Sequence, residues 1–375
     1  MKISEIGVRG FTMLMLASAM PFAQGQTVDA DGYLEPHYET LFGLDGLAVG
    51  DFDGDGLLDF STLVRREGTD NDSYTHQQIG IGFGQSDGGF SLTEYRDDGD
   101  PAFGYAGGGV LFSQTADFNA DGHAELLIAD YSLPSTTYTQ FWAVDTARQV
   151  TLASYFEYGG YTNPMLDVDD ITGDGLPDLV TELGDYINLG GEYVFNFEEH
   201  YPEIPYGPNV VFIHDVTGDG IDDVGLRETD GAGVSKCVIY RGIARYQFDY
   251  SSPAGQCPRI TVAVGDFNGD GLADYLGLRE SRKRVLPTPA GSSPVYTLSQ
   301  RVYVFTGKRR GGFGSEVLYG LVKGGPLGGI DIRDFDFDGN DDALIATSQS
   351  KDSDSDVFDP DIFYSPGFVT LVKGR

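Results

Sequence analysis

The chain has 375 residues, a formal net charge of −34 and 40% hydrophobic residues. This apolar content excludes a globally disordered chain, and the strong negative charge excludes nucleic acid as a partner, because a phosphate backbone would be repelled. Glycine, with 53 residues, well exceeds its usual share of about 7%, which favours many turns between short strands.

Residues 1–25 are predicted to be a secretory signal peptide. Lys2 and Arg9 precede the apolar run FTMLMLASAM at residues 11–20, and small residues close to residue 25 offer a cleavage point. The run is too short to cross a bilayer, which takes about 18 or more apolar residues. No later stretch is that long. We therefore expect a secreted protein, extracellular or periplasmic, with no transmembrane segment.

An acidic nine-residue motif recurs six times along the chain, and we name its copies loops 1 to 6. They are DFDGDGLLD (51–59, loop 1), DFNADGHAE (117–125, loop 2), DITGDGLPD (170–178, loop 3), DVTGDGIDD (215–223, loop 4), DFNGDGLAD (266–274, loop 5) and DFDFDGNDD (334–342, loop 6). Each interval between copies can hold one supersecondary unit, so the pattern indicates a repeat architecture.

Short apolar stretches flank the motifs and predict four strands per repeat. GLAVG at 46–50 precedes a motif, and ELLIADY at 125–131 begins at the end of one. Two further strands fit into an interval, for example at 301–307 and 313–321. Four antiparallel strands per unit, repeated radially, describe an all-β fold, the β-propeller.

A glycine that closes the third strand and an aromatic residue that opens the fourth also recur. The pairs are Gly84 with Phe90, Gly190 with Phe195, Gly242 with Phe248, and Gly307 with Phe313. We interpret them as a turn and a core-facing ring at matching places in each blade.

The two ends of the domain are predicted to share one blade. Only two strands follow loop 6, at 342–348 and near 367–374, and one strand candidate without a partner, at 37–43, precedes loop 1. If this N-terminal strand completes the last blade, residues 26–375 form one propeller with six blades and no exposed edge. Seven blades remain possible, because a blade can lack the motif.

Alternate positions of the loops predict ligands for a hard cation. Position 1 is Asp51, Asp117, Asp170, Asp215, Asp266 or Asp334; position 3 is Asp53, Asn119, Thr172, Thr217, Asn268 or Asp336; position 5 is Asp55, Asp121, Asp174, Asp219, Asp270 or Asp338; position 7, through its backbone carbonyl, is Leu57, His123, Leu176, Ile221, Leu272 or Asn340; position 9 is Asp59, Glu125, Asp178, Asp223, Asp274 or Asp342. Calcium takes about six to eight oxygen ligands, and glycine at position 6 permits the sharp turn. We expect several structural Ca²⁺ ions, up to six.

An EF-hand is excluded as the source of this pattern. Strands rather than helices flank the loops, and the twelfth position is never acidic. The alternative is a set of acidic turns without metal, since Asp and Gly favour turns. Carboxylates crowded into one turn repel each other unless a cation neutralises them, which favours metal binding.

The repeated D-x-[DNT]-x-D-G-x-x-D loops between strands resemble FG-GAP or VCBS repeats, whose best-known members form the integrin α-chain propeller. The stretch GFGQSDGGF at 82–90 also resembles the strand-ending glycine and aromatic residue of VCBS repeats. The resemblance implies a calcium-binding propeller, here a secreted member of bacterial type, often with seven blades. Glu125 at position 9 of loop 2 and Phe337 at position 4 of loop 6 depart from the family pattern.

Cys237 and Cys257 are the two cysteines of the chain. In an oxidising compartment, such a pair is more often a disulfide than two free thiols. We expect a structural bridge within the fourth unit.

Two basic runs, RKR at 282–284 and KRR at 308–310, are candidates for an anion site. In an antiparallel blade they belong to opposite ends, and only the second shares the end that carries the acidic loops. We interpret it as an offset to local acidity.

Two classes of function remain open. The first is a monomeric, calcium-stabilised propeller that acts as a binding or adhesion module for an extracellular protein or glycan. The second is an extracellular polysaccharide lyase or hydrolase, with His76 near Tyr74, or His200 near Tyr201, as the proton-abstracting group. The chain contains no recognised catalytic motif, so we favour the binding module and assign no catalytic residue.

Overall fold

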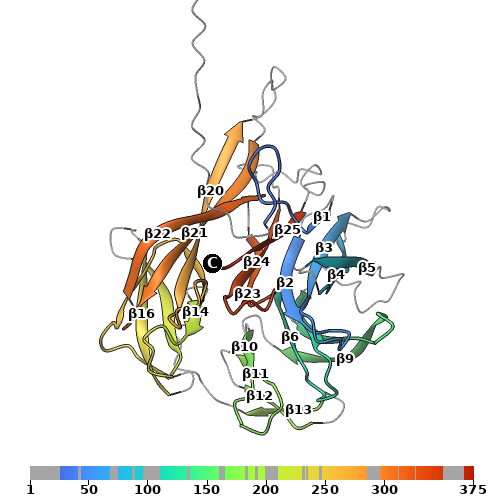
Figure 1. Ribbon diagram of the computed structural model, residues 1–375. Helices are drawn as coiled ribbons and strands as arrows, with labels where there is room; N and C mark the ends of the chain where they lie inside the picture. Colours follow the sequence, from blue (N-terminus) through green and yellow to red (C-terminus); the bar gives the residue numbers. More distant parts are fainter. Residues whose placement is uncertain are drawn as a thin grey trace, which may run out of the picture.

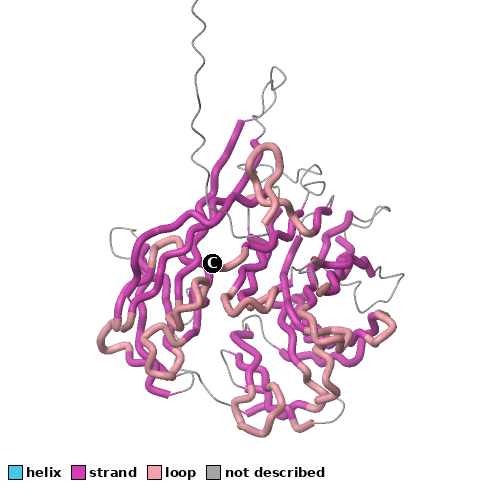
Figure 2. Tube along the Cα trace, viewed as in Figure 1, coloured by secondary structure: helices cyan, strands magenta, loops and turns pink. Residues whose placement is uncertain are grey.

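The computed structural model describes most of the chain between residues 26 and 375. The described ranges are 26–40, 44–67, 75–86, 89–95, 110–132, 136–159, 165–181, 185–190, 193–198, 210–229, 233, 235–244, 247–284, 296–310, 312–325, 327–348 and 367–375. The predicted signal peptide lies outside these ranges. Within them the chain forms strands and turns and no α-helix (Figure 2), and no helix suited to crossing a membrane is found there.

Six antiparallel sheets, the blades, are arranged in a ring (Figure 1). From the inner strand outward, blade 1 is β2 (Leu44–Gly50), β3 (Asp59–Glu67), β4 (Thr75–Gly84) and β5 (Phe90–Tyr95); blade 2 is β6 (Val110–Ala116), β7 (Glu125–Ser132), β8 (Thr136–Val144) and β9 (Val150–Gly159); blade 3 is β10 (Met165–Asp169), β11 (Asp178–Thr181), β12 (Asp185–Asn188) and β13 (Phe195–Glu198). Blade 4 is β14 (Val210–His214), β15 (Asp223–Thr229), β16 (Ser235–Ala244) and β17 (Gln247–Asp249); blade 5 is β19 (Thr261–Gly265), β20 (Asp274–Arg284), β21 (Tyr296–Lys308) and β22 (Gly312–Lys323); blade 6 is β23 (Leu327–Arg333), β24 (Asp342–Ser348), β25 (Gly367–Val372) and β1 (Tyr38–Thr40). The prediction of a six-bladed, all-β propeller is confirmed.

The ring closes through the N-terminal strand, as the sequence predicts. β1 pairs antiparallel with β25, with Tyr38 opposite Val369 and Thr40 opposite Gly367. The outer strand of blade 6 thus comes from the start of the domain and its other three strands from the end. This pairing accounts for the strand candidate before loop 1, and it leaves six blades rather than seven.

Blade 4 has a fifth strand that the sequence did not predict. β18 (Gly255–Cys257) pairs with the first half of β16, beside the place where β17 pairs with its second half. Cys237 in β16 lies directly opposite Cys257 in β18, and the two form a disulfide with 5.1 Å between their Cα atoms. The bridge therefore ties the segment after β17 back onto its own blade.

The hydrophobic core consists mainly of clusters that lie between neighbouring blades. Phe52 and Phe83 of blade 1 pack with Leu126 and Trp142 of blade 2, and similar clusters join blades 2 and 3, 4 and 5, 5 and 6, and 6 and 1. Burying such side chains contributes about 1.5 to 3 kcal/mol each. At these five boundaries the packing holds neighbouring blades, and the loops that they carry, against each other.

The acidic loops occupy the same place in every blade. Position 1 directly follows the inner strand, and position 9 is the first residue of the second strand, for example Asp51 after β2 and Asp59 at the start of β3. The predicted aromatic residues open or lie in the outer strands. Phe313, however, is 37% exposed, although its ring makes edge-on contacts with Tyr275 and Phe305. Its prediction as a core-facing ring is therefore only partly right.

Candidate metal sites in the acidic loops

Position 1 shapes every loop. One oxygen of its carboxylate accepts the N–H of position 5, and the other accepts the N–H of position 6, as Asp51 does for Asp55 at 3.1 Å and Gly56 at 2.9 Å. The same pair of hydrogen bonds occurs in loops 2 to 6. Position 6 has φ between 77° and 92° in all six loops, a conformation that requires glycine.

Position 4 also has a left-handed backbone in all six loops. Glycine provides it in loops 1, 3, 4 and 5, while Ala120 has φ 60° in loop 2 and Phe337 has φ 58° in loop 6. A bulky side chain is strained in this conformation. Phe337 is also 64% exposed, so packing does not repay the strain.

Position 9 joins the loop to the third strand of its own blade. Asp59 is fully buried; one of its oxygens accepts the N–H of Phe52 at 2.9 Å, and the other accepts the N–H of Gly84 at 2.7 Å. The corresponding donors are Asn188 of β12 for Asp178, Gly242 of β16 for Asp223, Gly307 of β21 for Asp274, and Gly374, two residues after β25, for Asp342. The carboxylate predicted as a closing ligand is thus also a buried acceptor that holds the blade together.

The sequence analysis missed the reason for the third-strand glycines. A Cβ at Gly84, Gly242, Gly307 or Gly374 would lie 2.1 to 2.5 Å from the carbonyl oxygen of position 8, because the two strands approach so closely there. Gly190, predicted to close the third strand of blade 3, lies after β12 instead, and the N–H of Asn188 makes the bond to Asp178.

Loop 2 differs because its ninth residue is a glutamate. Glu125 still accepts the N–H of Phe118 at 2.8 Å, but its other oxygen accepts the side-chain N–H of Asn119 at 2.7 Å. Asn119 also donates to the hydroxyl of Tyr193 from blade 3 at 3.2 Å. The longer side chain therefore reaches back into its own loop, which blade 3 supports from outside.

Neighbouring loops touch across the blade boundaries. The N–H of Ala124 in loop 2 donates to the carbonyl of Asp51 in loop 1 at 2.8 Å, and the N–H of Asp341 in loop 6 donates to Asp266 in loop 5 at 2.9 Å. The imidazole of His123 lies so close to Gly54 that a Cβ there would be 2.7 Å from the ring. Two pairs of loops, 1 with 2 and 5 with 6, are therefore in direct contact.

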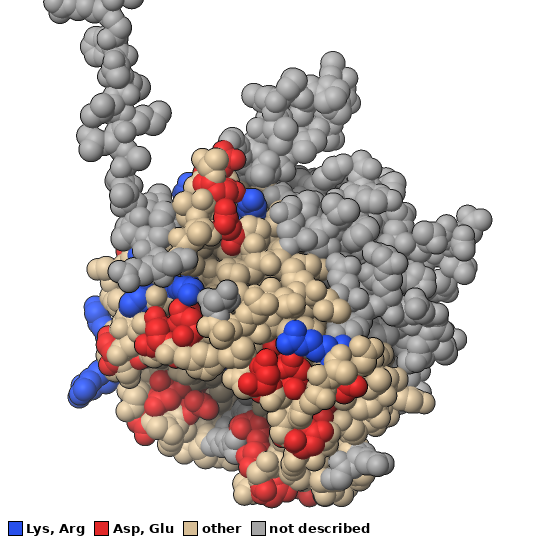
Figure 3. All heavy atoms as spheres, turned by 45° about the vertical axis from the view of Figure 1, so that its right-hand side comes forward, with Lys and Arg blue, Asp and Glu red and all other residues tan. Residues whose placement is uncertain are grey.

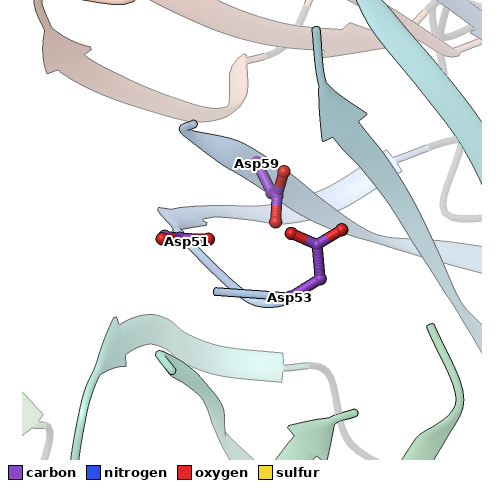
Figure 4. Close-up of side chains that lie close together, drawn as sticks. All are labelled: Asp51, Asp53 and Asp59. Carbon is purple, nitrogen blue, oxygen red and sulfur yellow. The ribbon is translucent and has the colours of Figure 1, made fainter. Parts of the chain in front are cut away.

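In three loops the carboxylates converge on a common point. Oxygens of Asp51, Asp53 and Asp59 lie within 4.8 Å of one another, as do those of the corresponding groups in loops 2 and 6 (Figure 4 shows loop 1). The other two groups are Asp117, Asp121 and Glu125, and Asp334, Asp336 and Asp342. Two of these three loops are the ones that depart from the family pattern. Acidic side chains also gather in several patches on the face shown in Figure 3.

Burial and crowding make the ninth carboxylates hard to ionise. Burial raises the pKa of Asp59 to about 7, with neighbouring Asp53 and Asp51 adding to the effect and the N–H groups of Gly84 and Phe52 opposing it. The same cause raises the pKa of Glu125 to about 7, of Asp342 to about 7 and of Asp274 to about 6. A bound cation would replace the proton and remove this cost.

The residues present fit a hard divalent cation. All candidate side-chain ligands offer oxygen, and the carboxylate groups in loops 1, 2 and 6 are close enough together to share one ion. In loop 6, Oδ1 of Asp336 is buried and has no hydrogen-bond partner, so it is an acceptor without a donor. The carbonyl ligands predicted at position 7, and the identity of the ion, remain predictions.

The other candidate residues are only partly within the described ranges. The backbone of His76 lies in β4, opposite Arg66, but its side chain is not among the described parts of the chain. Tyr74, His200 and Tyr201 lie wholly outside the described residues. The enzyme hypothesis that rests on them stays a prediction. The run at 282–284 ends β20 far from loop 5, whereas Lys308 ends β21 next to it, so the two basic runs do not join.

Comparisons with known proteins identify no family for this chain. No family model matches it, and no curated protein matches it. Among solved structures, the mannose phosphorylase MPT-4 from Leishmania mexicana, in complex with phosphate ion, superposes with a TM-score of 0.32 and 12% identity, over 88% of this chain and 83% of that one. So distant a likeness supports no inference about function. The resemblance to FG-GAP and VCBS repeats stays a prediction.

Proposed function

We propose that this protein is a secreted β-propeller of the FG-GAP or VCBS type, stabilised by calcium, that acts as a binding module for an extracellular protein or glycan. The observation that carries the proposal is the convergence of Asp51, Asp53 and Asp59, of which Asp53 and Asp59 are buried. Like charges held so close in a region of low dielectric are costly. The guanidinium of Arg148, whose Nε is 2.8 Å from Asp53, offsets one of these charges, and a divalent cation between the carboxylates would offset the others.

Side chains at positions 1, 3, 5 and 9 and the carbonyl of position 7 would hold the ion. The hydrogen bonds from position 1 already hold the loop closed, and those from position 9 fix the loop against the third strand. Calcium would supply positive charge that joins these oxygens. Because these hydrogen bonds already fix the loop, the protein presents the ligands to the ion with little rearrangement. The role of the metal is structural.

Metal content and thermal stability test the structural part of the proposal. A calcium concentration of 100 times Kd stabilises a folded protein by about 2.7 kcal/mol per site, which is about 4 °C in Tm for a domain of this size. We expect chelation to lower Tm by at least this amount, and added Ca²⁺ to restore it better than Mg²⁺, which needs a stricter octahedral geometry. An identical Tm with and without chelator, after metal analysis shows that calcium has been removed, would refute structural calcium.

The binding role is supported by the ring itself. The six blades present loops at both ends of the ring, and the described residues contain no constellation suited to covalent or acid–base catalysis beyond the loop carboxylates, which are engaged in hydrogen bonds. Arrays of extracellular glycans and proteins, probed with the calcium-loaded protein, test the role. Reproducible binding to one ligand class supports it, whereas turnover of a glycan without stable binding would favour an enzyme.

A further inference from the structure

The third position separates loops 1 and 6 from the other four. Only these two have Asp there, Asp53 and Asp336, while loops 2 to 5 have Asn or Thr. Each of the two carboxylates lies against a basic side chain from outside its loop. Nε of Arg148 is 2.8 Å from Oδ2 of Asp53, and Nζ of Lys373 is 2.8 Å from Oδ2 of Asp336.

Arg148 is held in place by structure that belongs to the next blade. It lies in the turn between β8 and β9 of blade 2, where one carboxylate oxygen of Asp145 accepts the N–H groups of Ala147 and Gln149 at 2.9 and 2.8 Å. Its backbone is left-handed, with φ 61°. A side chain other than Gly or Asn in this conformation costs about 1 kcal/mol, so something must repay the strain.

The side chain of Arg148 bridges two blades. Its guanidinium lies 4.3 Å from the centre of the Phe83 ring in β4 of blade 1 and reaches Asp53 from there. A second nitrogen, Nη2, is 3.9 Å from Oδ2 of Asp55, at position 5 of the same loop. The Asp53 side chain is only 6% exposed, so its charge is poorly screened by water.

Lys373 makes the equivalent contact in blade 6 from a different place. It directly follows β25, and the next residue, Gly374, donates its N–H to Asp342 at position 9 of loop 6 at 2.7 Å. The side chains of Lys373 and Asp336 are each 19% exposed. Two unrelated segments thus bring a cation to the same position of the two loops that have a fourth carboxylate.

We propose that Arg148 and Lys373 are built-in counter-cations that compete with the divalent ion for the position-3 carboxylates of loops 1 and 6. This inference rests on the proposed calcium binding. Without metal, each basic side chain neutralises the fourth carboxylate and keeps the loop closed. With metal, the ion attracts the same carboxylate and repels the basic side chain, so the ion pair contributes less to stability.

The competition has two consequences. Loops 1 and 6 bind the divalent ion more weakly than four unpaired carboxylates would, and they depend less on the ion for their shape. Arg241 lies 3.0 Å from Asp219 in loop 4, but it is excluded from this role because Asp219 stands at position 5 and its side chain is 32% exposed, against 6% for Asp53 and 19% for Asp336. Such surface pairs contribute little.

The test compares Arg148→Gln with the charge-matched control Arg309→Gln in the full chain. Arg309 lies in the exposed turn after β21, and no ion pair joins it to another described residue. We expect Arg148→Gln, relative to the control, to lower Tm in chelator, to lose most of this deficit in saturating Ca²⁺, and to bind Ca²⁺ about 3- to 10-fold more tightly at one site by calorimetry.

Other outcomes have distinct meanings. Weaker calcium binding, or a Tm deficit that is equal with and without calcium, would overturn the competition and make Arg148 a residue that only positions Asp53. If Arg148→Gln does not fold, Arg148→Lys keeps the charge but loses the planar contact with Phe83, and its calcium affinity is expected to stay within about 3-fold of the wild type. A larger increase in its affinity would overturn the proposal.

The proposed function can fail separately. If the wild type takes up no calcium, the calcium-binding function is wrong and the competition falls with it. If the wild type binds calcium but Arg148→Gln binds it no more tightly than Arg309→Gln does, only the competition is wrong. Lys373→Gln, measured in the same way, is expected to show the same pattern at loop 6.

Discussion

Replacing Gly307 with Ala tests whether the ninth carboxylate holds the loop against the third strand. The N–H of Gly307 donates to Oδ1 of Asp274 at 2.6 Å, and Asp274 is fully buried. A Cβ on residue 307 would lie 2.1 Å from the carbonyl oxygen of Ala273 and 2.8 Å from its carbonyl carbon. Both are backbone atoms of loop 5, so they cannot rotate away as a side chain would.

The cost of the substitution follows from this geometry. To relieve the clash, β21 must move away from the start of β20, which lengthens or breaks the hydrogen bond to Asp274. Overpacking a tight site costs about 1 to 3 kcal/mol, and leaving a buried acceptor without its donor costs about 1 to 3 kcal/mol more. A loss of about 3 to 5 kcal/mol corresponds to about 4 to 7 °C in Tm for a domain of this size.

Gly312 provides a matched control five residues further along the same hairpin. It opens β22, its φ is not left-handed, and a Cβ there would meet only the side chain of Lys308 at 3.5 Å, an ordinary contact. Gly312→Ala is therefore expected to change Tm by less than about 2 °C. Thermal melts of both variants, at fixed calcium and in chelator, give the comparison. The reasoning is refuted if Gly307→Ala melts within 2 °C of the control in both conditions.

Two further predictions concern stability without metal and at loop 6. The pKa values of Asp59, Glu125 and Asp342 are each raised to about 7, so between about pH 4 and 7 the folded state without metal binds more protons than the unfolded state. Stability in chelator therefore falls as pH rises through this window. Tm is expected to be lower at pH 8 than at pH 5, and an equal or higher Tm at pH 8 contradicts the assignment. Phe337→Gly removes an exposed side chain from a left-handed position and is expected to stabilise the protein by about 1 kcal/mol, whereas a clear drop in urea midpoint would show that the ring has a packing role.

Much of the fold could be predicted because the same motif recurs once in every blade. The six copies of the motif mark the turn between the first and second strands of each blade, and an acidic residue at position 9 coincides with the first residue of the second strand every time. The strand before loop 1 had no partner within its own repeat, so its pairing with the last strand followed from closure of the ring. Local sequence and global topology agree at these points.

The partners of position 9 could not be predicted in the same way. The third-strand donor is Gly84 for Asp59 but Asn188 for Asp178. Gly84 lies 25 residues after its carboxylate in the sequence, and Asn188 lies 10 residues after its own. The distance depends on the lengths of two strands and a loop, which the motif does not encode. Arg148 was missed for a related reason, because it reaches loop 1 from another blade, 95 residues away from Asp53 in sequence.

The acidic pattern has two physical causes that the sequence alone does not separate. The fold needs Asp at position 1 to cap the turn, glycine at position 6 for its backbone, and a buried acceptor at position 9 for the third strand, whether or not an ion is bound. Position 3 is the one side chain whose identity varies among Asp, Asn and Thr. Where it is Asp, a basic side chain of the protein accompanies it. The charge of each loop, rather than the number of its acidic residues, is therefore the quantity that should determine its affinity for a cation.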